Sequence, residues 1–223
     1  RHGLRVAARL ERAGALDDRT LLAHGVHLDA DELGLVLAAD SFLAHNARSN
    51  MNNAVGRARL EALAGRVALG TDGIGSDMFE ESRAAFFRLR EDDVHAGAEW
   101  PLDRLAVGSA LAATAFGERH LGTLDVGAPA DLVVLDYAAP TPVDAHTFPG
   151  HWVYGLGSRH VRDVMVAGEW VVLDRRLTRA DHRELAAEAR DQAERLWERL
   201  EEVPQHELEP EGGLRCPSPL TIE

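Results

Sequence analysis

One pattern recurs three times in the first 90 residues: a short apolar run followed by an amphipathic stretch. The apolar runs are residues 20–26 (TLLAHGV), 41–45 (SFLAH) and 66–70 (RVALG). We expect each run to be a strand, preceded by a helix at 4–14 and followed by helices at 29–39, 55–64 and 78–89. Asp29 and Glu32 have the spacing of a capping box at the start of the second helix. Alternating strands and helices predict an α/β fold with a parallel sheet.

Polar side chains follow the three apolar runs at their carboxyl ends, namely His24, His45 and Asp72. A doubly wound open sheet and a TIM-like (β/α)8 barrel both fit the strand–helix repeat. An open sheet usually concentrates its site at one switch point beside a glycine-rich phosphate loop, and the sequence contains no such loop. Barrel enzymes draw their chemistry from the ends of several strands. The sequence therefore favours a partial barrel with these three side chains at one rim.

The pattern changes after a further helix, which begins at Pro101 and ends near Phe116. Residues 132–135 form an apolar run, and residues 164–166 and 170–172 flank a hairpin turn. We expect four parts: a partial barrel at 1–118, a β unit at 119–177, a helix at 178–202 capped by Thr178, and a loose tail at 203–223.

Composition excludes several classes of protein. The net charge of −13 argues against affinity for nucleic acid or an anionic membrane surface, and no apolar stretch approaches the ~20 residues of a membrane span. The single cysteine, Cys216, excludes a disulfide within the chain and indicates a reducing compartment, the cytoplasm. The sequence contains no Gly-x-Ser-x-Gly nucleophile motif.

Three segments could carry chemistry. In residues 69–73 (LGTDG), Asp72 could ligate a divalent metal and accept a proton from metal-bound water, but a turn aspartate that caps a helix has the same local pattern. The imidazole of His24 could bind metal or substrate, or it could be structural. Residues 45–53 contain one His, four Asn and one Ser, which suits a polar pocket or an ordinary turn. The residues alone leave these alternatives open.

Taken in order, these segments resemble the amidohydrolase superfamily, in its aminohydrolase and chlorohydrolase branch and there the SsnA-type aminohydrolases. Residues 21–28 resemble the family's sixth-strand segment, 45–53 its seventh-strand pocket segment, and 70–73 its eighth-strand motif with the metal-binding Asp. Residues 122–135 resemble the return into its composite β-sandwich. The resemblance implies the C-terminal half of a TIM-like (β/α)8 metal-dependent hydrolase barrel plus part of that sandwich.

The same resemblance implies roles for residues of this chain. Asp72 would be a metal ligand and a proton acceptor, and His24 would bind metal, hydroxide or substrate. The side chains implied to face the substrate are His45, Asn46, Ser49 and Asn50. The cofactor would be a divalent metal, zinc or iron. The reaction would be hydrolysis of a C–N bond (deamination) or a C–halide bond in a small heterocycle such as a purine, pyrimidine or triazine.

The chain also departs from the family. The first-strand His-x-His pair and the fifth-strand His, which supply most metal ligands, have no counterpart here. A complete barrel needs ~250 residues, and a catalytic zinc usually has three protein ligands. The N-terminus also lacks Met and enters directly into helix-like sequence. From the absent ligands, the short length and this N-terminus, we expect that the missing N-terminal half of the same protein is a required partner and that this chain alone is inactive. Assembly into a homo-oligomer is compatible with the sequence.

Two alternatives remain open. One is a non-catalytic binding or assembly protein that retains the amidohydrolase fold. The other is an unrelated α/β protein of the doubly wound class.

Overall fold

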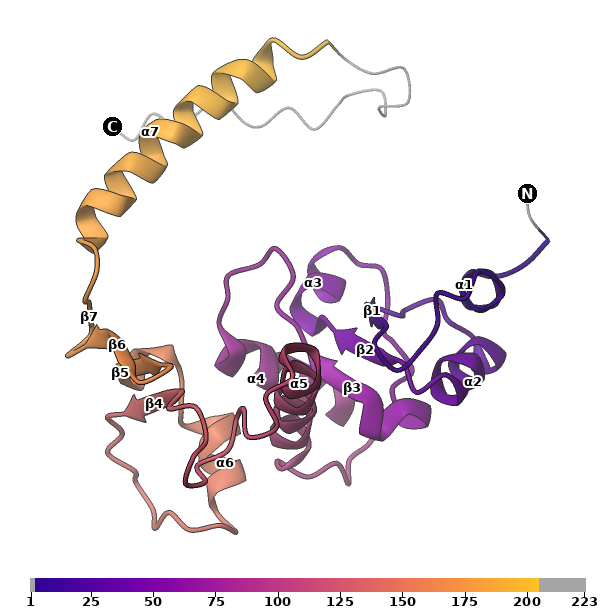
Figure 1. Ribbon diagram of the computed structural model, residues 1–223, viewed down its shortest axis with the longest axis horizontal. Helices are drawn as coiled ribbons and strands as arrows, with labels where there is room; N and C mark the ends of the chain where they lie inside the picture. The colour runs from indigo at the N-terminus through magenta and orange to yellow at the C-terminus, as the bar shows by residue number, and fades with distance from the viewer. Residues whose placement is uncertain (1–2, 205–223) are drawn as a thin grey trace. The chain divides into compact units, whose positions relative to one another are not determined.

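The computed structural model describes residues 3–204, with only the backbone described at positions 61, 62 and 64. The chain forms two units, one up to Arg175 and one from Arg176 onward. The first unit contains two sheets and six of the helices shown in Figure 1.

Three parallel strands form the first sheet, in the order β1-β2-β3 (Figure 1). They are β1 (Leu21–Ala23), β2 (Phe42–His45) and β3 (Val67–Leu69). Leu22 pairs with Leu43, and Ala44 pairs with Ala68. The predicted strands and their parallel, sequential order are confirmed. Because the strands are parallel, their carboxyl ends meet at one edge of the sheet.

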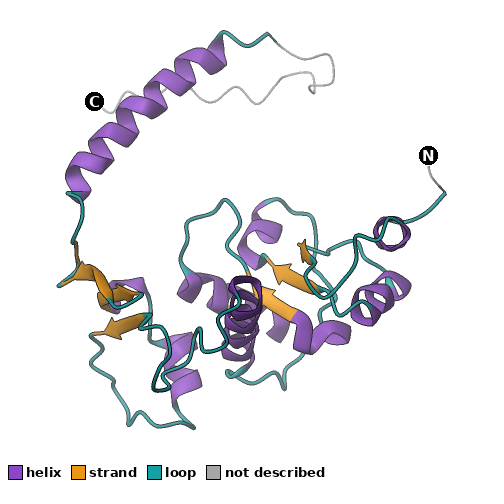
Figure 2. Cartoon of the chain, viewed as in Figure 1, coloured by secondary structure: helices purple, strands orange, loops and turns teal. Residues whose placement is uncertain are grey.

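Helices connect and cover these strands (Figure 2). Helix α1 (Val6–Arg12) packs on α2 (Ala30–Ala38), which links β1 to β2. Helix α5 (Trp100–Phe116) packs on β3, and α4 (Met78–Arg90) contacts α5. Pro101 lies in the first turn of α5, where its missing N–H costs no hydrogen bond.

The start of α2 is fixed by the predicted capping box. The Asp29 carboxylate accepts the Glu32 N–H at 2.9 Å, and the Glu32 carboxylate accepts the Asp29 N–H at 3.3 Å. Glu32 is buried, and it also accepts the Ala7 N–H at 3.0 Å and the Arg5 guanidinium at 2.7 Å. Burial by itself raises the pKa of Glu32, but these donors outweigh it and lower the pKa. One carboxylate therefore ties α1 to the first turn of α2.

The core lies between β2, β3 and the helices on one side of the sheet. It is an apolar cluster of buried residues from α1, α2, the strands and the segment that precedes β3: Ala7, Leu33, Val36, Leu43, Ala58, Leu60, Leu63 and Val67. Phe42 and Leu43 are both buried although they are neighbours in β2. Burial on both faces is what a central parallel strand requires.

The predicted helix at 55–64 is wrong. The helix after β2 is instead α3 (Ala47–Asn52), within the Asn-rich segment, and a 3-10 helix (Glu61–Arg66) precedes β3. Ala54 and Gly56 have positive φ angles of 51° and 103°, which end the helical path after α3. The apolar residues that suggested a helical face instead place Ala58 and Leu60 in the core from an irregular segment.

The second sheet of this unit is antiparallel. Strand β5 (Val161–Val166) pairs with β4 (Leu132–Leu135) on one side and with β6 (Glu169–Leu173) on the other. Ala167 and Gly168 have φ angles of 50° and 83°, and two positive φ values are typical of the turn that joins a tight hairpin. The predicted hairpin is confirmed.

Helix α6 (Phe148–Tyr154), which the sequence pattern did not indicate, packs on α4, and a 3-10 turn (Ser158–His160) precedes β5. His151 in α6 is buried and bonded to the Tyr137 hydroxyl at 3.0 Å. This contact joins α6 to the segment that follows β4.

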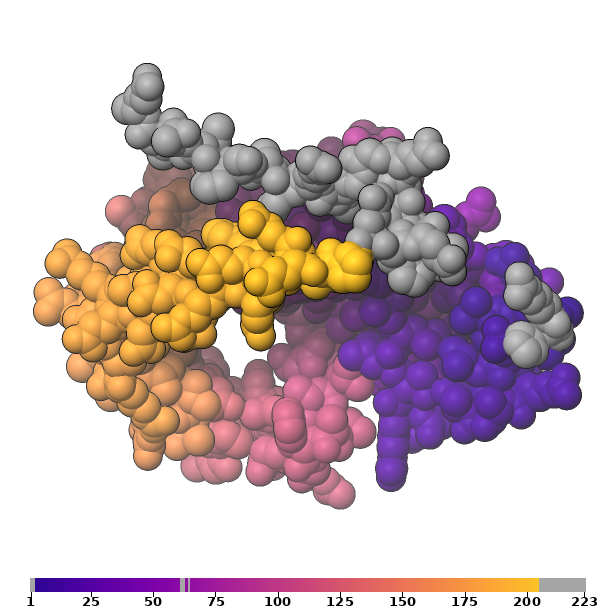
Figure 3. Space-filling view, turned by 90° about the horizontal axis from the view of Figure 1, so that it is seen from above, coloured from indigo at the N-terminus to yellow at the C-terminus, as the bar shows by residue number. Residues whose placement is uncertain are grey.

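The second unit contains β7 (Arg176–Leu177) and α7 (His182–Glu201). The cap of α7 is Asp181, whose carboxylate accepts the Arg183 N–H at 2.7 Å, and not the predicted Thr178. Apart from the half-buried Ala193, every residue of α7 is exposed. This helix is the yellow segment in Figure 3. No helix in residues 3–204 is both long and apolar enough to span a membrane. Most of the predicted tail, residues 205–223, lies outside the described part, and the predicted domain limits stay predictions.

The capping box generates the first prediction. Asp29→Ala should lower the free energy of unfolding by about 1 kcal/mol, because the Glu32 N–H loses its acceptor. Asp29→Asn should be nearly neutral, since an amide oxygen caps about as well as a carboxylate. Denaturant unfolding of the two variants measures the difference. Equal losses in both would show that the ion pair with Arg5, and not the cap, is the important contact.

Candidate functional site

The candidate site lies at the carboxyl edge of the parallel sheet. His24 directly follows β1, His45 is the last residue of β2, and Asp72 lies in the turn after β3. His24 and Asp72 have φ angles of 66° and 54°, in a left-handed region that residues other than glycine seldom adopt. Such backbone angles are retained at a cost, and they cluster at functional sites.

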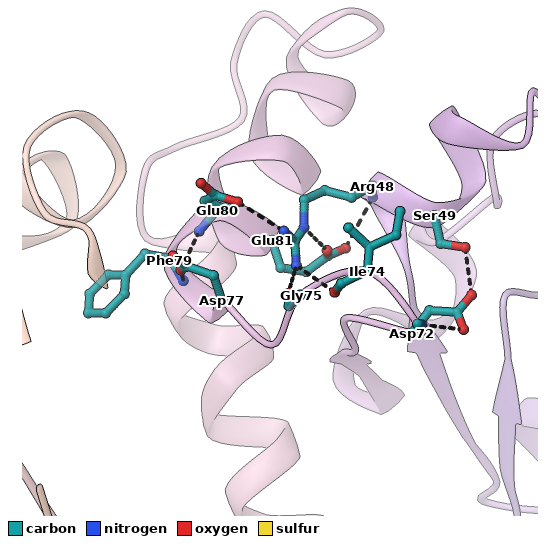
Figure 4. Close-up of polar contacts among 10 residues, drawn as sticks. Arg48, Ser49, Asp72, Ile74, Gly75, Asp77, Phe79, Glu80 and Glu81 are labelled. Carbon is teal, nitrogen blue, oxygen red and sulfur yellow. Dashed lines mark hydrogen bonds and ion pairs between the residues drawn. The ribbon is translucent and has the colours of Figure 1, made fainter. Parts of the chain in front are cut away.

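Asp72 is held by three groups. The Ser49 hydroxyl donates to Oδ2 at 2.5 Å (Figure 4), and the Gly73 N–H donates to Oδ1 at 2.7 Å. The His24 Nε2 atom lies 3.6 Å from Oδ2. The Ser49 hydrogen bond, followed by the Gly73 hydrogen bond and the charge of His24, lowers the pKa of Asp72 below its ordinary value. The side chain is therefore a carboxylate at neutral pH.

His24 is oriented from its other ring nitrogen. Nδ1 lies 2.9 Å from Oδ1 of Asn50, a residue of α3. Because an amide oxygen only accepts, this contact places a proton on Nδ1. The other ring nitrogen, Nε2, is the one that faces Asp72. This is the arrangement by which a second residue orients a ligating histidine.

The pair His24 and Asp72 lines a cavity of about 530 Å³. Asn50 and Asn53 contribute polar groups to its wall, and Val26, Leu28 and Val55 contribute apolar ones. A concave site with mainly apolar walls and a few convergent polar groups suits a small organic molecule.

His45 and Asn46 are buried and do not line this cavity. His45 Nδ1, Asn46 Oδ1 and Asn50 Nδ2 have no hydrogen-bond partner among the described residues. Gly70 is needed beside them, because a Cβ there would come within 2.8 Å of Asn46 Nδ2. Buried polar atoms without a partner are uncommon in folded proteins, and three of them lie on residues close together in the chain here.

Burial controls the protonation of His45, which is 3% exposed. Burial first, and then the positive charges of Arg57 and Arg88, lower the pKa of His45 to about 4. The imidazole is therefore neutral at pH 7.

The structure thus brings together two hydrogen-bonded pairs, His24 with Asn50 and Ser49 with Asp72, which meet at the 3.6 Å contact between His24 and Asp72. His45 and Asn46 are buried and take no part in these contacts. Sequence analysis missed Arg48 and Glu81, which form an ion pair beside Ser49 at 2.7 Å. A signal for Glu81 was present, since this acidic residue falls on the apolar face of α4 with Ala85 and Leu89. Within residues 3–204, no three His, Cys, Asp or Glu side chains are grouped so as to hold a metal ion.

The pKa of His45 generates a prediction on pH. His45 titrates near 6.5 when unfolded and near 4 when folded, so the unfolded state binds more protons between these values. Stability should be complete above pH 6.5 and should fall by about 3 kcal/mol as the pH drops to 4. Denaturant unfolding at pH 6.5 and at pH 4 measures this loss. The His45→Gln variant should lack this part of the difference in unfolding free energy between the two pH values. An unchanged pH dependence in the variant would assign the effect to other groups.

The comparisons with known proteins agree with this geometry. Residues 2–171 match the sequence profile of the amidohydrolase family. A 5-methylthioadenosine/S-adenosylhomocysteine deaminase from Nitratidesulfovibrio vulgaris is 39% identical over 188 residues, which are 80% of this chain and 42% of that protein. A 5'-deoxyadenosine deaminase from Methanopyrus kandleri is 32% identical over 203 residues, which are 88% and 47% of the two chains. The chain spans less than half the length of both relatives.

A solved structure shows the same fold. The adenosine deaminase from Xanthomonas campestris, with bound zinc, superposes with a TM-score of 0.75 at 30% identity. The superposition covers 87% of this chain and 46% of that one. The fold thus matches that of a solved adenosine deaminase, and most of the sequence matches the profile of one family. The chain belongs to the amidohydrolase family.

Proposed function

We propose that this chain is the C-terminal half of a metal-dependent hydrolase that removes the amino group from a purine nucleoside or a related nitrogen heterocycle. The observation that carries the proposal is the Asp72 carboxylate facing the oriented His24 imidazole at 3.6 Å in the wall of a cavity. The family match and the deaminases among its relatives support it.

The Asp72 carboxylate and the His24 imidazole fit part of a zinc site. A carboxylate oxygen and an imidazole nitrogen are ordinary zinc ligands, and the Asn50 contact orients His24 as such a ligand requires. Two ligands are fewer than the three that a catalytic zinc usually has. In this proposal the missing N-terminal half of the protein supplies the others. When bound, the metal would act as a Lewis acid and lower the pKa of a water molecule bound to it.

Asp72 has the properties of the general base. The Asp72 side chain is ionised at neutral pH, it lines the cavity, and its Oδ2 lies toward His24. A carboxylate in this position accepts the proton of the attacking water and returns it to the leaving amine. The Ser49 and Gly73 hydrogen bonds fix the direction in which Asp72 accepts that proton.

The four proposed substrate-binding residues differ in their support. Asn50 is the best placed, because it lines the cavity and its buried Nδ2 has no partner within the described chain. His45 and Asn46 have unpaired buried atoms that a substrate or an ordered water could satisfy. Ser49 is better supported as the partner of Asp72.

The relatives at 30% identity or more favour deamination over removal of a halide. Those reported above are deaminases of adenine nucleosides by name. An adenine nucleoside also combines a polar amino group with an apolar ring face, which suits a cavity lined by both polar and apolar residues. The non-catalytic alternative gives no role to an ionised Asp72 facing an oriented histidine.

The test compares turnover of 5'-methylthioadenosine, 5'-deoxyadenosine and adenosine by the zinc-loaded full-length protein and its Asp72→Asn variant. Turnover should fall by ~10²–10⁴-fold, because an amide cannot accept the proton. The melting temperature should change little, since an amide oxygen still accepts from Ser49 or Gly73. The change of adenine to hypoxanthine absorbance follows the reaction.

The matched control is Asp181→Asn, the same change at the exposed cap of α7, which should leave turnover unchanged. Near-normal turnover in Asp72→Asn would reduce Asp72 to a turn residue. Failure of the unaltered protein to release ammonia from any of the three nucleosides would reject the proposed substrate class.

A further inference from the structure

Arg48 makes five hydrogen bonds to groups on α4 and on the loop that follows Asp72 (Figure 4). Its Nε donates to Glu81 Oε2 at 2.7 Å, its backbone N–H donates to Glu81 Oε1 at 3.3 Å, and its Nη1 donates to Glu80 at 3.0 Å. Its Nη2 donates to the carbonyl of Gly75 at 2.6 Å and to that of Ile74 at 3.4 Å. One side chain therefore links three separate segments.

The partner carboxylate is fully buried. The Glu81 side chain is 0% exposed and that of Arg48 is 14% exposed. Burying a charge is costly unless it is paired and hydrogen-bonded, and removing one partner of a buried pair leaves the other uncompensated. Both Glu81 oxygens accept from Arg48, so the carboxylate is fixed to the backbone and to the side chain of α3.

The position of this pair in the chain connects it to the site. Arg48 directly precedes Ser49, the donor to Asp72, and both lie on α3. The carbonyls of Ile74 and Gly75 lie two and three residues after Asp72, the acceptor. Arg48 thus holds both ends of the Ser49–Asp72 hydrogen bond from outside it.

We propose that Arg48 and Glu81 are positioning residues of the active site, which set the Ser49–Asp72 geometry by fixing α3 and the 74–75 loop to α4. This inference rests on the proposed roles of Asp72. It goes beyond them because neither Arg48 nor Glu81 lines the cavity. Lysine cannot replace Arg48, since a single ammonium lacks the planar fork that reaches Glu81 and the two carbonyls together.

Arg83 offers a matched control on the same helix. It also joins two elements with its guanidinium, donating to the carbonyl of Val153 at 2.8 Å and to that of Leu156 at 2.7 Å. These acceptors belong to α6 and the residues after it, and neither neighbours Asp72. Arg83→Lys therefore removes a comparable structural link without changing the setting of Asp72.

The experiment measures zinc affinity of the full-length protein by competition with a chromophoric chelator, together with kcat for the best nucleoside. Arg48→Lys and Glu81→Gln should each weaken zinc affinity and lower kcat by about 10-fold or more, the usual effect of losing a residue that orients a ligand. Arg83→Lys should leave both quantities unchanged, whatever its melting temperature. Glu81→Gln preserves size and one acceptor oxygen, so it serves if Arg48→Lys fails to fold.

A double-mutant cycle separates positioning from general stabilisation. In a Ser49→Ala background, Arg48→Lys should cause less than about a 2-fold further loss of zinc affinity, because the contact that it positions is already gone. An equal loss in both backgrounds, or a change in melting temperature alone, would overturn the inference. Zinc binding that requires Asp72 but not Arg48 would overturn only this inference. Zinc binding independent of Asp72 would overturn the proposed function with it.

Discussion

Parallel pairing of three short strands is the constraint on which the rest of the first unit depends. The strands contain only three or four residues each, yet their register places the residues after Ala23, Ala44 and Leu69 at one edge of the sheet. An antiparallel neighbour would have sent one of these chain segments to the opposite edge. Phe42 and Leu43 are buried on the two faces of β2, as a central strand of a covered parallel sheet requires.

A second layer of polar contacts lies along that edge. Ser49 and Gly73 hold Asp72, Asn50 holds His24, and the Arg48–Glu81 pair joins the elements that carry them. The left-handed backbone at His24 and Asp72 shows that local conformational preference is overridden there. The cavity beside them offers space for a ligand but lacks a complete set of metal donors within the described chain.

Local sequence signals predicted the elements that depend on local physics. The strands, the Asp29 capping box and the hairpin at 167–168 follow from hydrophobic runs, cap residues and turn residues, and all are present. The error at 55–64 arose because apolar residues that anchor an irregular segment in the core have nearly helical spacing. The sequence predicted Thr178 as the α7 cap, but Asp181, three residues later, is also a cap residue by type, and only the backbone path selects it.

For the candidate site, the positions of the residues could be predicted from the sequence, but their hydrogen-bond partners could not. The position of Asp72, His24 and His45 at strand ends followed from the strand pattern, and the resemblance to the family gave Ser49 and Asn50 as neighbours of the site. The hydrogen-bond partners of these residues could not be predicted, because His24 and Asn50 are 26 residues apart and Arg48 and Glu81 are 33 apart.

The most direct measurement is anomalous diffraction at the zinc edge from crystals of the full-length protein. The account predicts a zinc ion within ~2.0–2.2 Å of an Asp72 carboxylate oxygen and of His24 Nε2. A zinc ion bound elsewhere, with Asp72 bonded only to Ser49 and Gly73, would contradict it.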